Sequence, residues 1–471
     1  MSLITMLPDI LEAGKTEYKE IKAGMFFAVE AAGGFRNEAA GACRHTEAGC
    51  TSAEGQQTWK NLLAHGDNGA FMKALLHNEE MAGKLQMVYI DPPFFSKANY
   101  DAVIHVERPA EDGGTFSAKH LAYGDIWNQG IGQYLTMLTS RLMLIRDLLR
   151  DDGTVWVHLD WHAAHYVRIL MDEIFGADHF VNEIIWTYKS GGAGKKHFAR
   201  KHDTILVYSK TKDYYFSPLK EKSYNRGFKP YHFKGVEEFQ DETGWYTMVN
   251  MKDVWQIDMV GRTSAERTGY ATQKPEALLE RILACSSREG DLCGDFFCGS
   301  GTLAAVAQKM NRRWICCDQG RLAVASAYQR VLEGSQAADW GNWGSTMFLM
   351  QQGEDTQNVI SENLQVSLKD GVLQLTGCNI CLEGAGLDRE ELQTLSEIAE
   401  KTPLQLIAYW TIDDSYDGIL HRAKHVLLRK KGKLQTCWDT GAHDTASGTR
   451  NHDISVMAVD VLGNRYGAVL R

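Results

Sequence analysis

The sequence predicts an α/β protein with a mainly parallel sheet, and three observations carry this prediction. Residues 58–90 show the pattern of a strand, a helix and a second strand, an order typical of parallel sheets. Residues 291–318 repeat the pattern, with a glycine-rich turn after the first strand and an acid after the second. The apolar run Met87–Ile90 is the best-defined strand, because Asp91-Pro92-Pro93-Phe94 ends it abruptly.

Composition agrees with a globular protein of two or three domains. The chain has 471 residues, of which 44% are hydrophobic and only 8 are proline. It has no apolar run near the roughly 20 residues that span a bilayer, and its N-terminus lacks the basic start of a secretion signal. The ten cysteines are scattered, mostly in apolar runs, as is typical of reduced thiols. We therefore expect a cytoplasmic protein without a membrane segment.

The main domain is expected to begin near residue 58. Residues 1–57 are expected to form a poorly defined N-terminal arm, in which 30–54 is rich in small residues and shows no clear periodicity. Trp59 lies in a short strand that ends at the turn Gly66-Asp67-Asn68, and Phe71–His77 has helical spacing before the strand at 84–90.

The segment Asp91-Pro92-Pro93-Phe94 has the chemistry to hold a flat group that bears an amino substituent. Two prolines fix the backbone and remove two donors, so nearby carbonyls stay free to accept. Asp91 adds a carboxylate and Phe94 adds a ring, which suits a flipped-out adenine or cytosine. The tetrapeptide resembles the D-P-P-[YF] motif of DNA amino-methyltransferases, which methylate N6 of adenine or N4 of cytosine with S-adenosylmethionine. The structural alternative is a strand that simply ends at a tight Asp-Pro turn.

Residues 95–208 are expected to contain a loop, two helices and three strands. The polar, glycine-bearing stretch 95–126 is predicted to be a long loop that covers the target base. The pattern then predicts an amphipathic helix at 134–149, a strand at 154–159, a helix at 162–175, and strands at 180–188 and 203–208 that form a hairpin at the sheet edge. His158, Asp160, His162 and His165 invite a zinc interpretation, but no Cys or Glu completes a set at ligand spacing, so we expect no metal site.

Residues 189–270 are dense in basic and aromatic side chains. Between Lys189 and Lys234 there are twelve Lys and Arg against three acids, in a chain whose net charge is −10. Basic residues interleaved with rings suit phosphate neutralisation and base stacking, so we expect target recognition on DNA here. An insertion with its own small aromatic core is the alternative. The candidate DNA-binding residues are Lys189, Lys195, Lys196, Arg200, Lys201 and Arg226.

A nucleoside-binding site is predicted in the second strand–turn–helix unit. A strand at 291–297 meets the turn Cys298-Gly299-Ser300-Gly301-Thr302, and the next strand ends at Asp318. Glycines let a ligand approach the backbone, and Asp318 can accept from two ribose hydroxyls. A dinucleotide fold is the competitor, but Ala304 stands where the third glycine of G-x-G-x-x-G belongs. A cofactor without a pyrophosphate fits better.

The runs TQKPEALLERIL and DFFCGSGTLAAVAQKMNRRWICCD resemble the cofactor motifs of the same DNA amino-methyltransferases, over about residues 58–333. The catalytic motif precedes the recognition region and the cofactor motif, as in the permuted beta class, which includes type III Mod subunits. The resemblance implies a Rossmann-like, S-adenosylmethionine-dependent methyltransferase sheet with helices on both faces. It implies these cofactor-binding residues: Asp67, Thr272, Lys274, Pro275, Asp295, Phe296, Phe297, Gly299, Ser300, Gly301, Thr302 and Asp318. Phe94 replaces the common Tyr, and Phe95-Ser96 replace the common Asn-Thr, so loop contacts do not transfer.

Residues 334–471 are expected to form a separate, β-rich accessory domain. Strands are predicted near 365–376, 404–411, 425–428 and 454–461, with an amphipathic helix at 388–401. The domain resembles the C-terminal module of type III-like Mod proteins, which implies DNA support, dimerisation or docking of a nuclease. Cys378 and Cys381 form a lone C-x-x-C and are expected to be ordinary strand cysteines.

Taken with the resemblance, these patterns predict a site-specific methyltransferase that acts on N6 of a flipped adenine in duplex DNA within a restriction–modification or related system. Asp91, Pro92, Pro93 and Phe94 are the expected catalytic residues. Asp91 favours adenine because cytosine-N4 enzymes often carry Ser there. The alternatives are cytosine N4, a protein glutamine amide, RNA, or a catalytically silent DNA-binding scaffold. The expected partners are double-stranded DNA, a second copy of the chain, and a restriction nuclease or helicase subunit.

Overall fold

The computed structural model describes residues 3–23, 30–31, 49–51, 57–77, 81–107, 114–190, 192, 195–261, 263–337, 344–349, 363–383, 386–416, 421, 423–430, 432–440 and 453–470. Among these residues no helix combines the length and the apolar character needed to cross a membrane.

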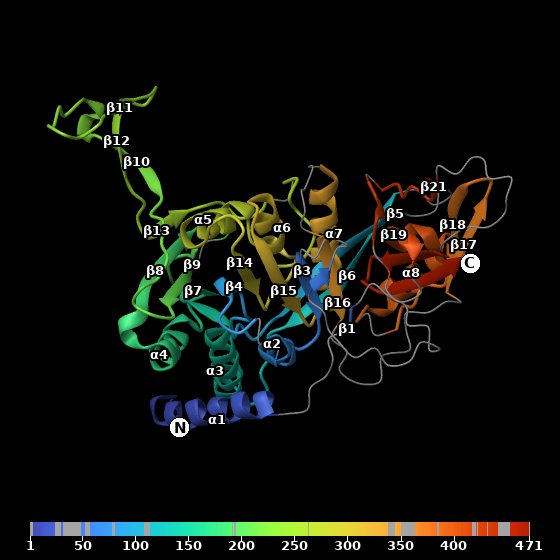
Figure 1. Ribbon diagram of the computed structural model, residues 1–471, viewed down its shortest axis with the longest axis horizontal. Helices are drawn as coiled ribbons and strands as arrows, with labels where there is room; N and C mark the ends of the chain where they lie inside the picture. Colours follow the sequence, from blue (N-terminus) through green and yellow to red (C-terminus); the bar gives the residue numbers. More distant parts are fainter. Residues whose placement is uncertain are drawn as a thin grey trace.

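The centre of the molecule is an 11-stranded mixed sheet whose core is parallel (Figure 1). Six strands, from β16 to β7 in sheet order, pair in parallel with their neighbours. The other pairings are antiparallel, except that β13 lies parallel to β8. In sheet order the strands are β1 (Glu30–Ala31), β16 (Gly344–Leu349), β3 (Gln57–His65), β15 (Arg313–Asp318), β14 (Leu292–Asp295), β4 (Leu85–Ile90), β7 (Leu149–Leu159), β9 (His202–Ser209), β8 (Phe180–Thr187) and β13 (Val254–Gln256), with β2 (Gly49–Thr51) paired to β3 as well.

Helices cover both faces of this sheet, as the resemblance implies. The alternation of β4 shows why: Val88 and Ile90 pack in the hydrophobic cluster of one face, whereas Met87 and Tyr89 pack in the cluster of the other. The first face carries α1 (Leu3–Ala23), α2 (Asn68–His77), α3 (Ile131–Leu148) and α4 (Ala164–Phe175). The second face carries α5 (Glu276–Ser286), α6 (Thr302–Lys309) and α7 (Arg321–Ala337).

Two segments differ from the sequence-based expectation. No element was predicted before residue 58, yet α1 packs along α3, with Leu7, Ile10 and Leu11 facing the core at helical spacing. Of the rest of the expected arm, residues 30–31 and 49–51 form β1 and β2, and residues 1–2, 24–29, 32–48 and 52–56 lie outside the described residues. The predicted loop at 95–126 is wrong for most of its length, because β5 (Asn99–Glu107) and β6 (Thr115–Gly124) form an antiparallel hairpin.

The remaining strands form smaller sheets outside the central one. In the 189–270 region, β10 (Lys220–Tyr224), β12 (Trp245–Asn250) and β11 (Phe239–Gln240) make an arm that projects from the body (Figure 1). The C-terminal domain, residues 363–470, is β-rich as predicted. Its first sheet consists of β17 (Leu364–Lys369), β18 (Val372–Cys378) and β21 (Cys437–Asp439). Its second sheet consists of β20 (His425–Leu428), β19 (Ile407–Tyr416), β22 (Asp453–Asp460) and β23 (Arg465–Leu470). The domain also contains helix α8 (Arg389–Lys401). Short 3-10 turns occur at Ala177–His179, Arg226–Phe228 and Pro403–Leu406.

Gly301 occupies a position where an added side chain would meet the backbone and side chain of a neighbouring helix. Its φ is +72°, and an added Cβ would lie 2.6 Å from the Cβ of Ala327 in α7. We expect Gly301→Ala to lower the free energy of unfolding by about 2–5 kcal/mol, because left-handed strain and overpacking add. Gly290→Ala is the control, since Gly290 has φ +79° but no atom within 4 Å of its added Cβ. Urea unfolding of both variants tests this, and equal losses would show that close approach to α7 is unimportant.

Candidate active site

A cleft lies at the carboxyl ends of the parallel strands, where ligands bind in open α/β sheets. The residues that directly follow four neighbouring strands, β3, β15, β14 and β4, lie at this edge. Strands β4 and β14 pair directly, with Met87 opposite Cys293 and Val88 opposite Gly294. Asp91 and Gly299, 208 residues apart in the sequence, therefore line one cavity of about 340 Å³.

Most of the predicted catalytic and cofactor residues meet in this cleft. The predicted residues that line it are Asp67, Asp91, Pro92, Pro93, Phe94, Thr272, Lys274, Asp295, Phe296, Phe297, Gly299, Ser300, Thr302 and Asp318. Pro275 and Gly301 do not line it: Pro275 caps the start of α5, and Gly301 caps the start of α6. Thr302, the first residue of α6, connects that helix to the segment before α5. Its hydroxyl donates to the carbonyl of Lys274 (3.1 Å) and accepts from Arg330 (2.9 Å).

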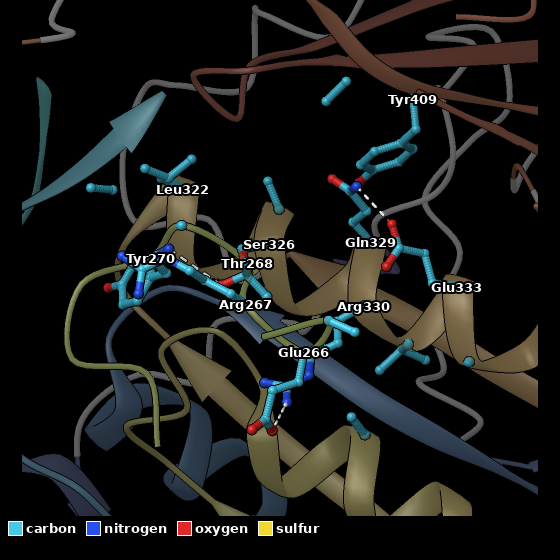
Figure 2. A pocket seen from close by; sticks show the side chains of 18 of the residues that line it. Glu266, Arg267, Thr268, Tyr270, Leu322, Ser326, Gln329, Arg330, Glu333 and Tyr409 are labelled. Atoms are coloured by element: carbon cyan, nitrogen blue, oxygen red, sulfur yellow. Dashed lines mark hydrogen bonds and ion pairs between the residues drawn. The ribbon is translucent and has the colours of Figure 1, made fainter. Parts of the chain in front are cut away.

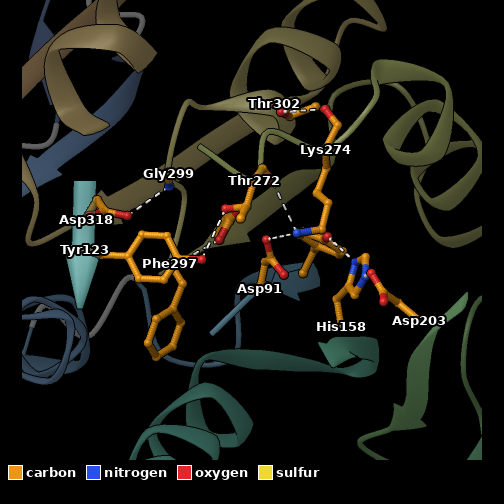
Figure 3. A network of polar contacts seen from close by, with 12 residues as sticks. Asp91, Tyr123, His158, Asp203, Thr272, Lys274, Phe297, Gly299, Thr302 and Asp318 are labelled. Atoms are coloured by element: carbon orange, nitrogen blue, oxygen red, sulfur yellow. Dashed lines mark hydrogen bonds and ion pairs between the residues drawn. The ribbon is translucent and has the colours of Figure 1, made fainter. Parts of the chain in front are cut away.

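The glycine-rich turn and Asp318 are held together by hydrogen bonds. The amide of Gly299 donates to Asp318 Oδ2 at 2.8 Å (Figure 3). The amide of Gly320 donates to Oδ1, also at 2.8 Å. Burial raises the pKa of the Asp318 carboxyl, and the two amides oppose that rise. The carboxylate is thus fixed in place at the end of β15, with lone pairs left to accept from a ligand's hydroxyls.

The cleft carries more acidic than basic side chains. Asp67, Asp91, Asp295 and Asp318 line it, against Lys274 and Arg141. Burial raises the pKa of Asp295 well above its usual value, and the neighbouring charges of Asp91 and Asp318 raise it further. Such surroundings favour a cationic ligand and oppose an anionic one. A sulfonium with an α-ammonium group fits this donor and charge set, whereas a pyrophosphate does not.

Asp91 is paired on one side and free on the other. Lys274 Nζ, from a segment 183 residues away, donates to Asp91 Oδ2 (Figure 3). Oδ1 is buried and accepts no hydrogen bond from the described residues, so it is an unused acceptor inside the cleft. The Lys274 ammonium also lies 5.3 Å from the ring centroid of Phe94. The resemblance assigns Lys274 to the cofactor, but in the structure its ammonium contacts Asp91 and Phe94 of the catalytic segment as well as the carbonyl of Thr272.

A buried polar group supports Phe94 from behind. The ring of His158 stacks on Phe94 at 5.9 Å and 24°. One ring nitrogen of His158 contacts Tyr89 Oη (2.8 Å), and the other contacts Asp203 Oδ2 (3.1 Å). His158 therefore belongs to this network (Figure 3). Within the described part of the chain, no group of three His, Cys, Asp or Glu side chains is placed to hold a metal ion.

Some residues of the site were missed by the sequence reasoning. Arg141 lies within the helix predicted at 134–149, and no role was predicted for it. The structure buries it, where it donates to Asp67 Oδ2 (3.0 Å) and pairs with Glu17 of α1. Tyr123 of β6 reaches Thr272 (3.2 Å), so the hairpin forms a wall of the cleft. Alternation of Ala102, Ile104 and Val106 was the signal for that hairpin.

The six candidate DNA-binding residues fall into two places. Lys189, Lys195, Lys196, Arg200 and Lys201 lie between β8 and β9, whereas Arg226 lies on the projecting arm. Since Leu159, at the carboxyl end of β7, pairs with Thr204 near the start of β9, the first group lies at the same sheet edge as Asp91. Arg200 stacks over the ring of Trp161 at 3.9 Å, and Phe198 beside it is 98% exposed.

A second, larger cleft of about 950 Å³ lies between α7, β5, residues 263–270 and β19 (Figure 2). Several of its polar residues pair with one another: Arg330 contacts Glu276 at 2.8 Å and Glu266 at 3.7 Å, and Gln329 donates to Glu333. None of the predicted catalytic or cofactor residues lines it. Size therefore does not identify the functional cleft, whereas the convergence of strand ends does.

The fold and cleft define an α/β protein that places a carboxylate and a ring beside a nucleoside-type site. Comparison with known proteins specifies the family: residues 85–329, just over half of the chain, match the DNA methylase family N6_N4_Mtase. The chain therefore belongs to this family. It is 27% identical over 311 residues to the type II methyltransferase M.EcaI of Enterobacter cloacae, covering 53% of this chain and 65% of that one.

Two further similarities extend this comparison. The probable type III restriction-modification enzyme HindVI Mod subunit of Haemophilus influenzae is 23% identical over 424 residues, covering 61% of this chain and 53% of that subunit. A solved M1.HpyAVI–SAM complex is 16% identical with a TM-score of 0.36, covering 57% of this chain and 98% of that one. The chain thus spans about two thirds and about half of the lengths of the two named relatives.

Proposed function

We propose that this protein is a site-specific DNA methyltransferase that modifies N6 of adenine, with S-adenosylmethionine as the methyl donor. The single observation that supports it best is the free Oδ1 of Asp91 in the cleft that also contains Gly299 and Asp318. An acceptor for an amino group and a cradle for a nucleoside then share one cavity. Membership of the DNA methylase family supports DNA as the substrate.

The residues of the chain act on the target base mainly by holding it. Asp91 Oδ1 and the carbonyl of Pro92 accept hydrogen bonds from the exocyclic amino group of a base flipped out of the duplex. Phe94, braced by His158, stacks against the base. The negative charge of Asp91 stabilises the positive charge that develops on the nitrogen, which afterwards loses one proton.

The cofactor site is assigned by the same chemistry. Asp318 accepts from the ribose hydroxyls, and the turn at 298–302 lies against the methionine end. When bound, S-adenosylmethionine supplies an electrophilic methyl group, so that the base nitrogen gains a bond to carbon while the sulfur keeps the electron pair of the broken bond. The excess of carboxyl groups over basic groups in the cleft favours the cationic sulfonium, which would in turn lower the raised pKa of Asp295.

The experiment is transfer of a labelled methyl group to DNA, followed by digestion and separation of the nucleosides. Label in N6-methyladenine supports the proposal. Label in N4-methylcytosine would show that the target base is cytosine, while the protein would still be a DNA methyltransferase. The choice of adenine depends on Asp91. Label in RNA or protein, or cofactor binding without any transfer, would overturn the proposed function.

The basic residues between β8 and β9 are proposed to contact the DNA backbone. Lys195 and Lys196 are exposed at the same edge as the active cleft. Their double replacement by Ala should weaken DNA binding about tenfold at ~0.1 M salt and lower the slope of log K against log salt by about 2. Lys369→Ala/Lys401→Ala, on the C-terminal domain, removes the same charge from exposed sites. Equal loss in both double variants, measured by fluorescence anisotropy, would contradict this assignment.

The relatives support one partner proposal. A Mod subunit, by its name, is one part of a restriction–modification enzyme, and one such subunit is 23% identical to this chain over 61% of its length. We propose that this protein likewise works with a restriction nuclease subunit. Co-purification from the native host tests this partnership independently of the methyl-transfer assay.

A further inference from the structure

The carboxylate of Asp125 binds backbone amides at the end of the catalytic tetrapeptide and directly after it. Its side chain is only 1% exposed. The carboxylate accepts from the amides of Phe94 (3.1 Å), Phe95 (3.1 Å) and Ser96 (2.6 Å), from the Ser96 hydroxyl (2.7 Å), and from the indole nitrogen of Trp127 (2.9 Å). Three consecutive amides that converge on one anion form a nest, which fixes the course of the chain.

The same segment has an unfavourable backbone conformation. Phe95 has φ +63° and Lys97 has φ +60°, and this left-handed region is disfavoured for residues other than glycine. The main chain of Asp125 adds two more hydrogen bonds, accepting from Lys97 and donating to Ala98. Residues 91–98, which we call the catalytic loop, therefore keep this shape because Asp125 holds it. A strained segment persists only where its surroundings determine it.

Asp125 itself follows β6 of the hairpin β5–β6. The hairpin is a two-stranded sheet of its own, and its other end lies beside the C-terminal domain (Figure 1). There Ile104 and Val106 share a hydrophobic cluster with Leu395 and Ile398 of α8. The amide of Lys119 in β6 also donates to a carboxylate oxygen at the start of α8, at 2.7 Å. One rigid element thus connects α8 with the residue that shapes the catalytic loop.

We propose that the C-terminal domain supports the catalytic loop through hairpin β5–β6, with Asp125 as the positioning residue. Asp125 does not act on the substrate: its carboxylate already accepts five hydrogen bonds, and it is absent from the lining of the active cleft. The two strands are packed by apolar side chains at one end and held by a buried carboxylate at the other. A displacement of α8 should therefore displace Asp125 as well. Only the kinetic readout below rests on the proposed methyltransferase function.

The first test replaces Asp125 by Asn, which keeps the shape but sets an NH2 group against the donors. Hydrogen exchange in the peptide containing residues 94–98 should accelerate at least about tenfold, because the nest opens. The kcat for methyl transfer should fall about 100-fold while cofactor Kd stays within about threefold, since misplacement affects the chemical step. Asp101→Asn, exposed on the same hairpin, is the control. Unchanged exchange, or a loss confined to cofactor Kd, would overturn the positioning role.

The second test acts from the C-terminal domain. Leu395→Ala removes a fully buried contact in the cluster, whereas Leu392→Ala changes a residue of the same helix that is 42% exposed. Leu395→Ala should accelerate exchange in the hairpin and in residues 94–98 but leave β14 and β15 protected; Leu392→Ala should do neither. Ile398→Val is a milder variant for the case in which Leu395→Ala unfolds the domain. If faster exchange stops at the hairpin, the proposal is wrong. These exchange results decide the question even if the wild-type protein transfers no methyl group to DNA.

Discussion

Replacing Asp91 by alanine is expected to reduce methyl transfer at least about 10³-fold, because the charge that stabilises the reacting nitrogen is lost. Asp91 Oδ1 is the buried acceptor that no described residue occupies. The affinity for S-adenosylmethionine should change by no more than about threefold, since Asp318 and the glycine-rich turn remain. Single-turnover transfer of labelled methyl, together with calorimetric cofactor binding, separates these two quantities.

Two further variants make the Asp91 result interpretable. Asp91→Ala leaves Lys274 without its carboxylate in a site where the lysine is 8% exposed, which by itself costs stability. Asp91→Asn keeps an oxygen for that ammonium, so it should fold normally and still lose about 100-fold in rate. Asp101→Ala removes an exposed carboxylate nearby and should behave as wild type. Transfer by Asp91→Ala within tenfold of the wild-type rate would exclude the proposed role.

Replacing Asp318 by alanine is expected to weaken cofactor binding about 100-fold, because hydrogen bonds from ribose hydroxyls to a charged acceptor contribute about 1.5–3 kcal/mol each. The variant also removes the acceptor for the amides of Gly299 and Gly320, so the turn loses its anchor. Methyl transfer should recover in large part when cofactor is raised to saturation, unlike that of Asp91→Ala. This contrast between Kd and kcat distinguishes the two carboxylates.

The measurement is equilibrium binding of S-adenosylmethionine to the whole protein. Asp151→Ala, at a carboxylate whose side chain is 88% exposed, is the matched control and should bind normally. Asp318→Asn preserves the shape of the side chain and one acceptor oxygen. Its affinity for S-adenosylmethionine should lie between those of the wild type and Asp318→Ala. Binding by Asp318→Ala within threefold of wild type would show that the ribose is held elsewhere.

Local patterns in the sequence determined the α/β class, the order of catalytic and cofactor motifs, and most strands of the central sheet. Strand ends, glycine-rich turns and amphipathic stripes are local features, so Asp91, Gly299 and Asp318 could be recognised in isolation. In the structure these residues lie together because parallel strands end at one edge of a sheet. The pairing of β4 with β14 brings Asp91 and Gly299 to that edge.

Only the tertiary structure decided which side chains complete and brace the site. Lys274 contacts Asp91, which is 183 residues away in the sequence, and Arg141 joins Asp67 to α1. Asp125 holds a loop 30 residues away, at the end of a hairpin that packs against α8. The residue types were visible in the sequence, but their partners were not. Such contacts depend on how complete elements dock, and no local spacing or periodicity encodes the distance between two side chains on separate elements.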